Sequence, residues 1–293
     1  IIPKLAVPTI ISMLVTSIYN MADTFFVSQL GTSASGAVGI IFSAMAIIQA
    51  LAFMIGMGSG NYMTRSLGAG KRELAEQIVS IAFFTGIIMG LVITVSATFN
   101  IHRVVLLLGA TETIAPYAEA YAHYIFIAAP FMICSFIMNN LLRFQGKASF
   151  AMVGITVGGL LNIALDPLFI FAFHLGVRGA ALATILSQAV SCIWVLSFLC
   201  GKKTILHIRK KNLILKPEII LPCVALGLAT FIMQASESII SVCFNSSLLK
   251  YGGDIAVGAM TILTSVMQFA MLPLQGLGQG AQPVLSYNYG AIV

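Results

Sequence analysis

Long apolar runs are the feature that most limits how this chain can fold. Eight of them are long enough to cross a lipid bilayer as a helix, which takes about 20 residues. Short polar connections separate the runs, so little sequence is left for a water-exposed domain. We therefore expect eight membrane-spanning helices, at residues 5–30, 36–62, 76–99, 116–142, 149–173, 179–200, 218–249 and 255–285.

The scarcity of charge excludes the water-soluble classes. Charged residues make up 8% of the 293 residues and hydrophobic residues 59%, whereas an ordinary soluble domain has about 25% charged residues. So few charges cannot cover a surface that faces water, and the high hydrophobicity excludes a disordered chain. The sequence predicts an all-α polytopic membrane protein.

The basic residues predict the orientation in the membrane. Of the 15, all but three fall at the N-terminus or in the even-numbered connections, and basic residues stay on the cytoplasmic side. We expect a cytoplasmic N-terminus and a cytoplasmic loop at 201–217, and no nucleic acid partner is needed to explain the net charge of +6. The cytoplasmic set is Lys4, Arg65, Lys71, Arg72, Arg143, Lys147, Lys202, Lys203, Arg209, Lys210, Lys211 and Lys216, and the opposite set is Arg103, Arg178 and Lys250.

An internal repeat predicts the domain organisation. Gly56-x-Gly58-x-Gly60 recurs as Gly276-x-Gly278-x-Gly280, and Ala37-Val38-Gly39 recurs as Ala256-Val257-Gly258. Six predicted spans separate the two starts, so both copies begin on the same side, as in a parallel repeat about the membrane normal. We expect a six-helix first lobe at 1–200, a basic inter-lobe loop at 201–217 and the start of a second lobe at 218–293. The complete protein is then expected to have about twelve spans.

Short motifs from end to end of the chain carry a family resemblance. They are Pro8, Asp23-Thr24, Leu30-Gly31, Leu67-Gly68-Ala69-Gly70, Asn162-x3-Asp166-Pro167, Gly176-Val177-Arg178-Gly179-Ala180-Ala181 with Thr184, and Gln282-Pro283 with Asn288-Tyr289-Gly290-Ala291. Together they resemble the multidrug and toxic compound extrusion (MATE) transporters, and most closely the prokaryotic branch that includes the DNA-damage-inducible F-like proteins. The resemblance implies two six-helix lobes around a central cavity, cation-driven drug export, and a second lobe truncated after two helices.

Three acidic residues lie inside predicted spans: Asp23, Asp166 and Glu237. A charged group at mid-bilayer costs at least about 2.5–3.5 kcal/mol on the insertion scale, so each is a functional candidate. The alternative is a protonated carboxyl group that only holds helices together. Asp23 and Asp166 both lie about 23 Å above the cytoplasmic start of their helices, at a rise of about 1.5 Å per residue.

Other polar groups are expected beside these two carboxylates. Asn162 lies one turn before Asp166 on the same helix face, Thr184 reaches a similar depth, and Pro167 leaves a backbone carbonyl free. Such a set of oxygen atoms suits Na⁺, or a proton shared by two close carboxylates. The resemblance assigns the same four positions, Asp23, Asn162, Asp166 and Thr184, to the first-lobe cation site.

Glu237, with Gln234 one turn before it, is the candidate for a substrate cavity. Glu237 follows Pro222 at the interval at which Asp23 follows Pro8. Counting back from the glycines that end each helix places Phe244 at the equivalent position instead. A cavity acid and a buried structural glutamate both remain open.

These features predict a monomeric secondary-active multidrug antiporter in the plasma membrane of a bacterium or archaeon. It would exchange H⁺ or Na⁺ for organic, cationic compounds and need no cofactor besides the coupling ion. A flippase for lipid-linked oligosaccharides is the alternative, but it would need several basic residues around the cavity, and the predicted spans contain none. A membrane-embedded enzyme would need a metal-binding or nucleophile constellation, which the sequence lacks.

Overall fold

The computed structural model describes residues 2–201 and 204–292, which form helices and short connections. Lys202 and Lys203 of the predicted basic set lie outside the described residues. The side chains of the Ala256-Val257-Gly258 motif and of Lys250 are not described either. The full set of undescribed side chains within the described backbone is 210, 238, 239, 241, 242, 245, 246, 248–250, 252–259, 261, 262 and 265.

Seven helices are long and apolar enough to cross a membrane, counting only the described residues. They correspond to the first seven predicted spans, so the prediction of an all-α polytopic membrane protein is confirmed. The eighth predicted span, 255–285, includes many undescribed side chains. The helices are α1 (Ile2–Ser28), α2 (Thr32–Gly68), α3 (Arg72–Phe99), α4 (Ile101–Leu107), α5 (Ala115–Phe144), α6 (Ala148–Pro167), η1 (Leu168–Ala172), α7 (Val177–Cys200), η2 (Lys210–Asn212) and α8 (Pro217–Ile292).

One connection is more ordered than the sequence analysis predicted. Residues 100–115 contain α4, which lies against α5. The side chain of Val105 is fully buried there, because the apolar residues of this short segment can face the bundle while its polar residues face outward. Burial of an apolar face is what stabilises so short a helix.

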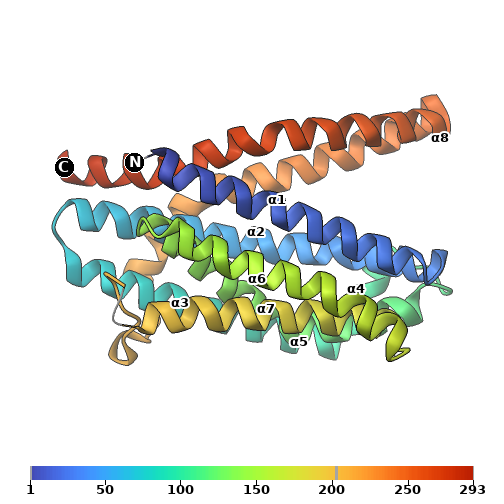
Figure 1. Ribbon diagram of the computed structural model, residues 1–293, viewed down its shortest axis with the longest axis horizontal. Coiled ribbons are helices and arrows are strands. Elements are labelled where there is room, and N and C mark those ends of the chain that lie inside the picture. The colour runs from blue at the N-terminus through green and yellow to red at the C-terminus, as the bar shows by residue number, and fades with distance from the viewer. Residues whose placement is uncertain (1, 202–203, 293) are drawn as a thin grey trace.

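The helices form one elongated bundle (Figure 1). α5 is the most buried of the described spans. α8 folds back on itself beside α1 and α2, so it has a first arm (217–237) and a second arm (266–292) that run in opposite directions. Both chain termini and the α2–α3 and α5–α6 turns lie at one end of the bundle, which we call the basic end. The α1–α2 turn and the reversal of α8 lie at the opposite end.

Glycines of the repeated motif bring α8 against α1 and α2. A Cβ atom at Gly58 would overlap the carbonyl oxygen of Cys223 in the first arm. A Cβ atom at Gly280 in the second arm would lie 2.7 Å from the Cα of Ala6 in α1. The second helix of each repeat therefore packs on the first helix of the other, at a distance that only glycine permits.

The contacts at the basic end are reciprocal residue by residue. A side chain at Gly68 would overlap the carbonyl of Tyr287, and one at Gly290 would overlap the carbonyl of Arg65. Gly68 and Gly290 are equivalent in the repeat, and Arg65 and Tyr287 each lie three residues earlier. A two-fold relation produces this pattern, because residue i then contacts j and the copy of j contacts the copy of i.

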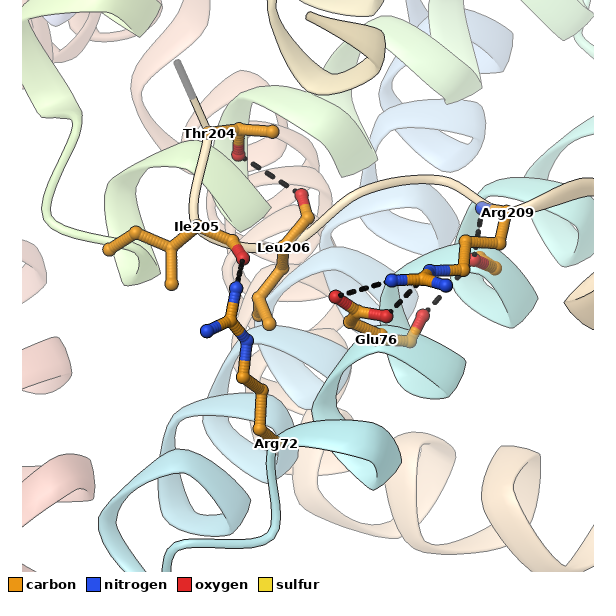
Figure 2. A network of polar contacts seen from close by, with 7 residues as sticks. Arg72, Glu76, Thr204, Ile205, Leu206 and Arg209 are labelled. Atoms are coloured by element: carbon orange, nitrogen blue, oxygen red, sulfur yellow. Dashed lines mark hydrogen bonds and ion pairs between the residues drawn. The ribbon is translucent and has the colours of Figure 1, made fainter. Parts of the chain in front are cut away.

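The segment after α7 is attached to the first bundle rather than extended as a free linker. The Nε of Arg209 lies 2.7 Å from a carboxylate oxygen of Glu76, and the guanidinium of Arg72 donates to the carbonyl of Ile205 at 3.0 Å (Figure 2). Leu206 between them is fully buried. Residues 204–209 of the predicted inter-lobe loop 201–217 are therefore held on α3, and the connection to α8 is shorter than the sequence indicates.

Candidate functional site

Two glycines of α6 bring α1 and α7 close to that helix. A Cβ atom at Gly158 would lie 3.1 Å from the carbonyl oxygen of Ser187 in α7, and one at Gly159 would lie 2.9 Å from Val15 in α1. Contacts at this distance require glycine. The three helices therefore converge beside the next two turns of α6, which carry Asn162 and Asp166.

The four residues of the predicted cation site are all buried. The exposed fractions are 4% for Asp23, 2% for Asn162, 0% for Asp166 and 8% for Thr184. Asp23 on α1 and Asp166 on α6 interact electrostatically, and Asn162 lies one turn before Asp166. The structure thus brings residues from three helices to one buried region.

Tyr121 of α5 completes this region, and the sequence analysis did not include it. Its side chain is fully buried, it interacts electrostatically with both Asp23 and Asp166, and it lies beside Thr184. Tyr117 and Tyr124 flank Tyr121, and nothing in the sequence distinguishes it from these neighbouring tyrosines. Only the packing of α5 against α7 reveals its position.

Several oxygen atoms in this region lack a hydrogen-bond donor. Among the described residues, no donor reaches one oxygen of Asp23, either oxygen of Asp166 or the amide oxygen of Asn162. The Thr184 hydroxyl donates to the carbonyl of Ala180 at 3.1 Å, so its oxygen can still accept. Buried unpaired polar atoms are costly and require an explanation such as a bound ion. Carboxylate, amide and hydroxyl oxygens fit a hard cation or a shared proton.

The backbone next to Asp166 is irregular. α6 ends at Pro167, and the wide helical turn η1 follows at once. A Cβ atom at Gly179 would lie 2.7 Å from the carbonyl oxygen of Phe169 in η1, so the start of α7 packs directly on this turn. Proline removes a backbone donor, and turns of the η1 type are frequent at functional sites.

A cavity of about 460 Å³ adjoins this buried region. Asn162 and Thr184 form part of its wall, while Asp23 and Asp166 are not among the lining residues. From α8, Gln234 and Glu237 line the same cavity. The remaining wall is mixed, with amide side chains such as Gln49, Gln188, Gln268, Gln275 and Gln282 and apolar side chains such as Met13, Phe53, Met57, Phe136, Met233 and Leu272.

Arg143 also lines the cavity, and this corrects the sequence analysis. The sequence places Arg143 in a connection and predicts spans without a basic residue. α5 extends two residues further, to Phe144, so Arg143 lies in its last turn. A polar stripe, Ser135, Asn139 and Arg143 at four-residue spacing, marks this face in the sequence. The absence of basic residues from the cavity is therefore no longer an argument against a flippase. A single described basic residue is still fewer than a flippase cavity would need.

The MatE family model matches residues 8–168 and 229–292. The chain belongs to the MatE family. The match confirms the predicted family, and it covers Asp23, Asn162 and Asp166 but not Thr184. The relatives of the chain are named as export proteins and transporters, and none of these is named as an enzyme.

The curated relatives of this MatE family chain are export proteins. It is 29% identical over 285 residues to the multidrug export protein MepA of Staphylococcus saprophyticus, which covers 97% of this chain and 63% of the relative. It is 28% identical over 288 residues to MepA of Staphylococcus aureus strain N315, covering 98% of this chain and 63% of the relative. The chain thus spans 63% of the length of these relatives.

Solved structures of transporters have the same fold. A MOP superfamily transporter from Pyrococcus furiosus superposes with a TM-score of 0.92 at 30% identity, covering 99% of this chain and 64% of that one. A MATE in complex with MaL6 superposes with a TM-score of 0.94 at 30% identity, covering 99% of this chain and 65% of that one. These similarities confirm a multi-pass membrane protein of the MatE family.

Proposed function

We propose that this chain forms the first lobe and the start of the second lobe of a secondary-active multidrug exporter. The exporter exchanges H⁺ or Na⁺ moving inward for organic, cationic compounds moving outward. It works as a monomer in the plasma membrane of a bacterium or archaeon, with its basic end in the cytoplasm. The observation that carries this proposal is the pair of buried carboxylates with unpaired oxygens directly behind the wall of a mixed polar and apolar cavity.

The coupling follows from the residues that the two regions share. Asn162 and Thr184 belong both to the cation site and to the cavity wall, so a cation that draws their oxygens inward changes the wall that a drug contacts. Without a cation or proton, the carboxylates of Asp23 and Asp166 repel each other. Cation binding therefore stabilises one conformation and the drug the other. Glu237 supplies a negative charge for the cationic compound.

The membrane potential is sufficient to drive such an exchange. One monovalent cation that crosses the full field releases about 2.3 kcal/mol per 100 mV. At about 1.4 kcal/mol per tenfold ratio, this supports a concentration ratio of about 50-fold for each cation. The energetics require neither ATP nor a nucleotide-binding domain.

The proposal is tested by drug transport into everted membrane vesicles that contain the longest natural form of the protein. Proton and sodium gradients are applied separately. We expect Asp23→Asn and Asp166→Asn each to abolish cation-driven transport while the protein still folds, because a neutral amide is cheaper to bury than an unpaired charge. The double variant should be no worse than either single one, because the two residues act as one site.

The matched control is Glu112→Gln, which removes an exposed carboxylate from the turn between α4 and α5. It should transport like the wild type. Full cation-driven transport by either aspartate variant would contradict the shared cation site.

A further inference from the structure

Arg143 is a positive charge in the cavity wall without a described acidic partner. Its guanidinium donates one hydrogen bond, at 2.9 Å, to the side-chain oxygen of Gln279 in the second arm of α8. In the part of the chain that the structure describes, the ion pairs are Arg209 with Glu76 and His102 with Glu119. An arginine has five donors in a planar fork, so most of its binding capacity is available to a ligand in the cavity.

The acid of the cavity, Glu237, is too far along the bundle to neutralise Arg143. Phe144 packs against Gly60, and Cys223 packs against Gly58, so Arg143 and Cys223 lie at about the same level near the basic end. Glu237 follows Cys223 by 14 residues, which is about 21 Å of helix at about 1.5 Å per residue. The cavity therefore has a positively charged side chain, Arg143, at its basic end and an acidic side chain, Glu237, toward its opposite end.

Hydrogen-bond acceptors lie beside the guanidinium. Asn139 and Asn140, one turn before Arg143 on α5, both line the cavity. Their amide groups donate to the carbonyls of Ser135 and Phe136, and their side-chain oxygens have no described donor. Both oxygens are buried behind the cavity surface, so the groups offered to a ligand here are the guanidinium of Arg143 and the side chain of Gln279.

We propose that Arg143 and Gln279 form a subsite for an acidic group, a carboxylate or sulfonate, of the transported compound. A planar carboxylate accepts two parallel hydrogen bonds from a guanidinium, and the Gln279 amide can donate to it as well. This inference rests on the proposed function, because it names the substrate class of the same cavity.

A matched pair of fluorescent dyes tests the subsite by binding. One is a rhodamine with a free carboxylate, and the other is the methyl ester of the same rhodamine. Both are titrated against the purified longest natural form of the protein by fluorescence polarisation. We expect Arg143→Gln to weaken binding of the carboxylate dye at least about tenfold, as expected for loss of a charged hydrogen bond, and binding of the ester less than about twofold. Arg143→Lys should keep part of the preference for the carboxylate, since it keeps the charge but loses the fork.

Lys147→Gln is the control, because this basic residue lies four residues after Arg143, in the connection between α5 and α6, and does not line the cavity. It should bind both dyes like the wild type. The subsite would be overturned if Arg143→Gln weakened the binding of both dyes equally or of neither. It would also be overturned if the wild type bound neither dye. Binding that depends on Arg143 without gradient-driven transport would support the subsite and remove the exporter proposal. Gradient-driven transport of the carboxylate dye that does not depend on Arg143 would support the exporter proposal and remove the subsite.

Discussion

Tyr121 adds to the candidate cation site a buried hydroxyl group that the sequence does not predict. Its hydroxyl lies near Asp23 and Asp166 and interacts with the side chain of Thr184. A buried hydroxyl can donate to a carboxylate or offer its oxygen to a cation, so its place in the core is more than packing. The apolar character of α5 conceals this role in the sequence.

We predict that Tyr121→Phe weakens cation binding without destabilising the protein. The Thr184 hydroxyl keeps its bond to the carbonyl of Ala180, so removing the Tyr121 hydroxyl leaves no buried donor without a partner. The melting temperature without cation should therefore change little. Loss of one ligand oxygen should lower the apparent cation affinity about three- to tenfold, which corresponds to about 1 kcal/mol. The measurement is the melting temperature at increasing Na⁺, and at decreasing pH, because a bound ligand stabilises the folded state. An unchanged dependence on both would place Tyr121 outside the site.

At the scale of helices, the glycines decide where the two repeats meet. The equivalent motifs Gly56–Gly60 and Gly276–Gly280 make different contacts. Gly58 is pressed against Cys223, whereas its equivalent, Gly278, has nothing within 4 Å of an added Cβ atom and lines the cavity. The same sequence motif therefore closes one interface and leaves space in the other.

This difference predicts opposite effects of one substitution at neighbouring positions. Gly280→Ala should lower the stability by about 1–3 kcal/mol, because its methyl group would lie 2.7 Å from the backbone of Ala6. Gly278→Ala should be neutral or stabilising by about 0.5–1 kcal/mol, since alanine favours a helix where space is free. Melting temperatures of the purified variants in one detergent check this order. A larger loss for Gly278→Ala would contradict the described contact between α8 and α1.

At the scale of the whole molecule, the basic end is closed by reciprocal contacts while the cavity lies between the first bundle and α8. The closed end carries most of the basic residues and the anchored loop at 204–209. A transporter must open this end in part of its cycle, so these contacts have to separate. The short connection between Arg209 and Pro217, whose η2 turn contacts α3, limits how far α8 can move from the first bundle.

The orientation of the molecule is tested by labelling single cysteines in a background that lacks the five native ones. Because basic residues stay in the cytoplasm, we expect a membrane-impermeant maleimide added to intact cells to label position 103 and not position 216. Arg103 and Lys216 are both exposed, so accessibility alone does not favour either. After the membrane is permeabilised, both should react. Labelling of position 216 in intact cells, with position 103 unlabelled, would reverse the topology.

The sequence by itself determined the class of protein, the first seven spans and the four residues of the candidate cation site. It could do so because bilayer thickness sets the length of an apolar helix and because a fixed rise per residue gives depth and helix face. The tertiary structure decided which helix faces meet. Tyr121 and Arg143 join the site and the cavity through the rotation of α5, and residues 204–209 are anchored by partners far away in sequence. Rotation between helices depends on close contacts such as those at Gly158 and Gly159, which periodicity along one helix cannot reveal.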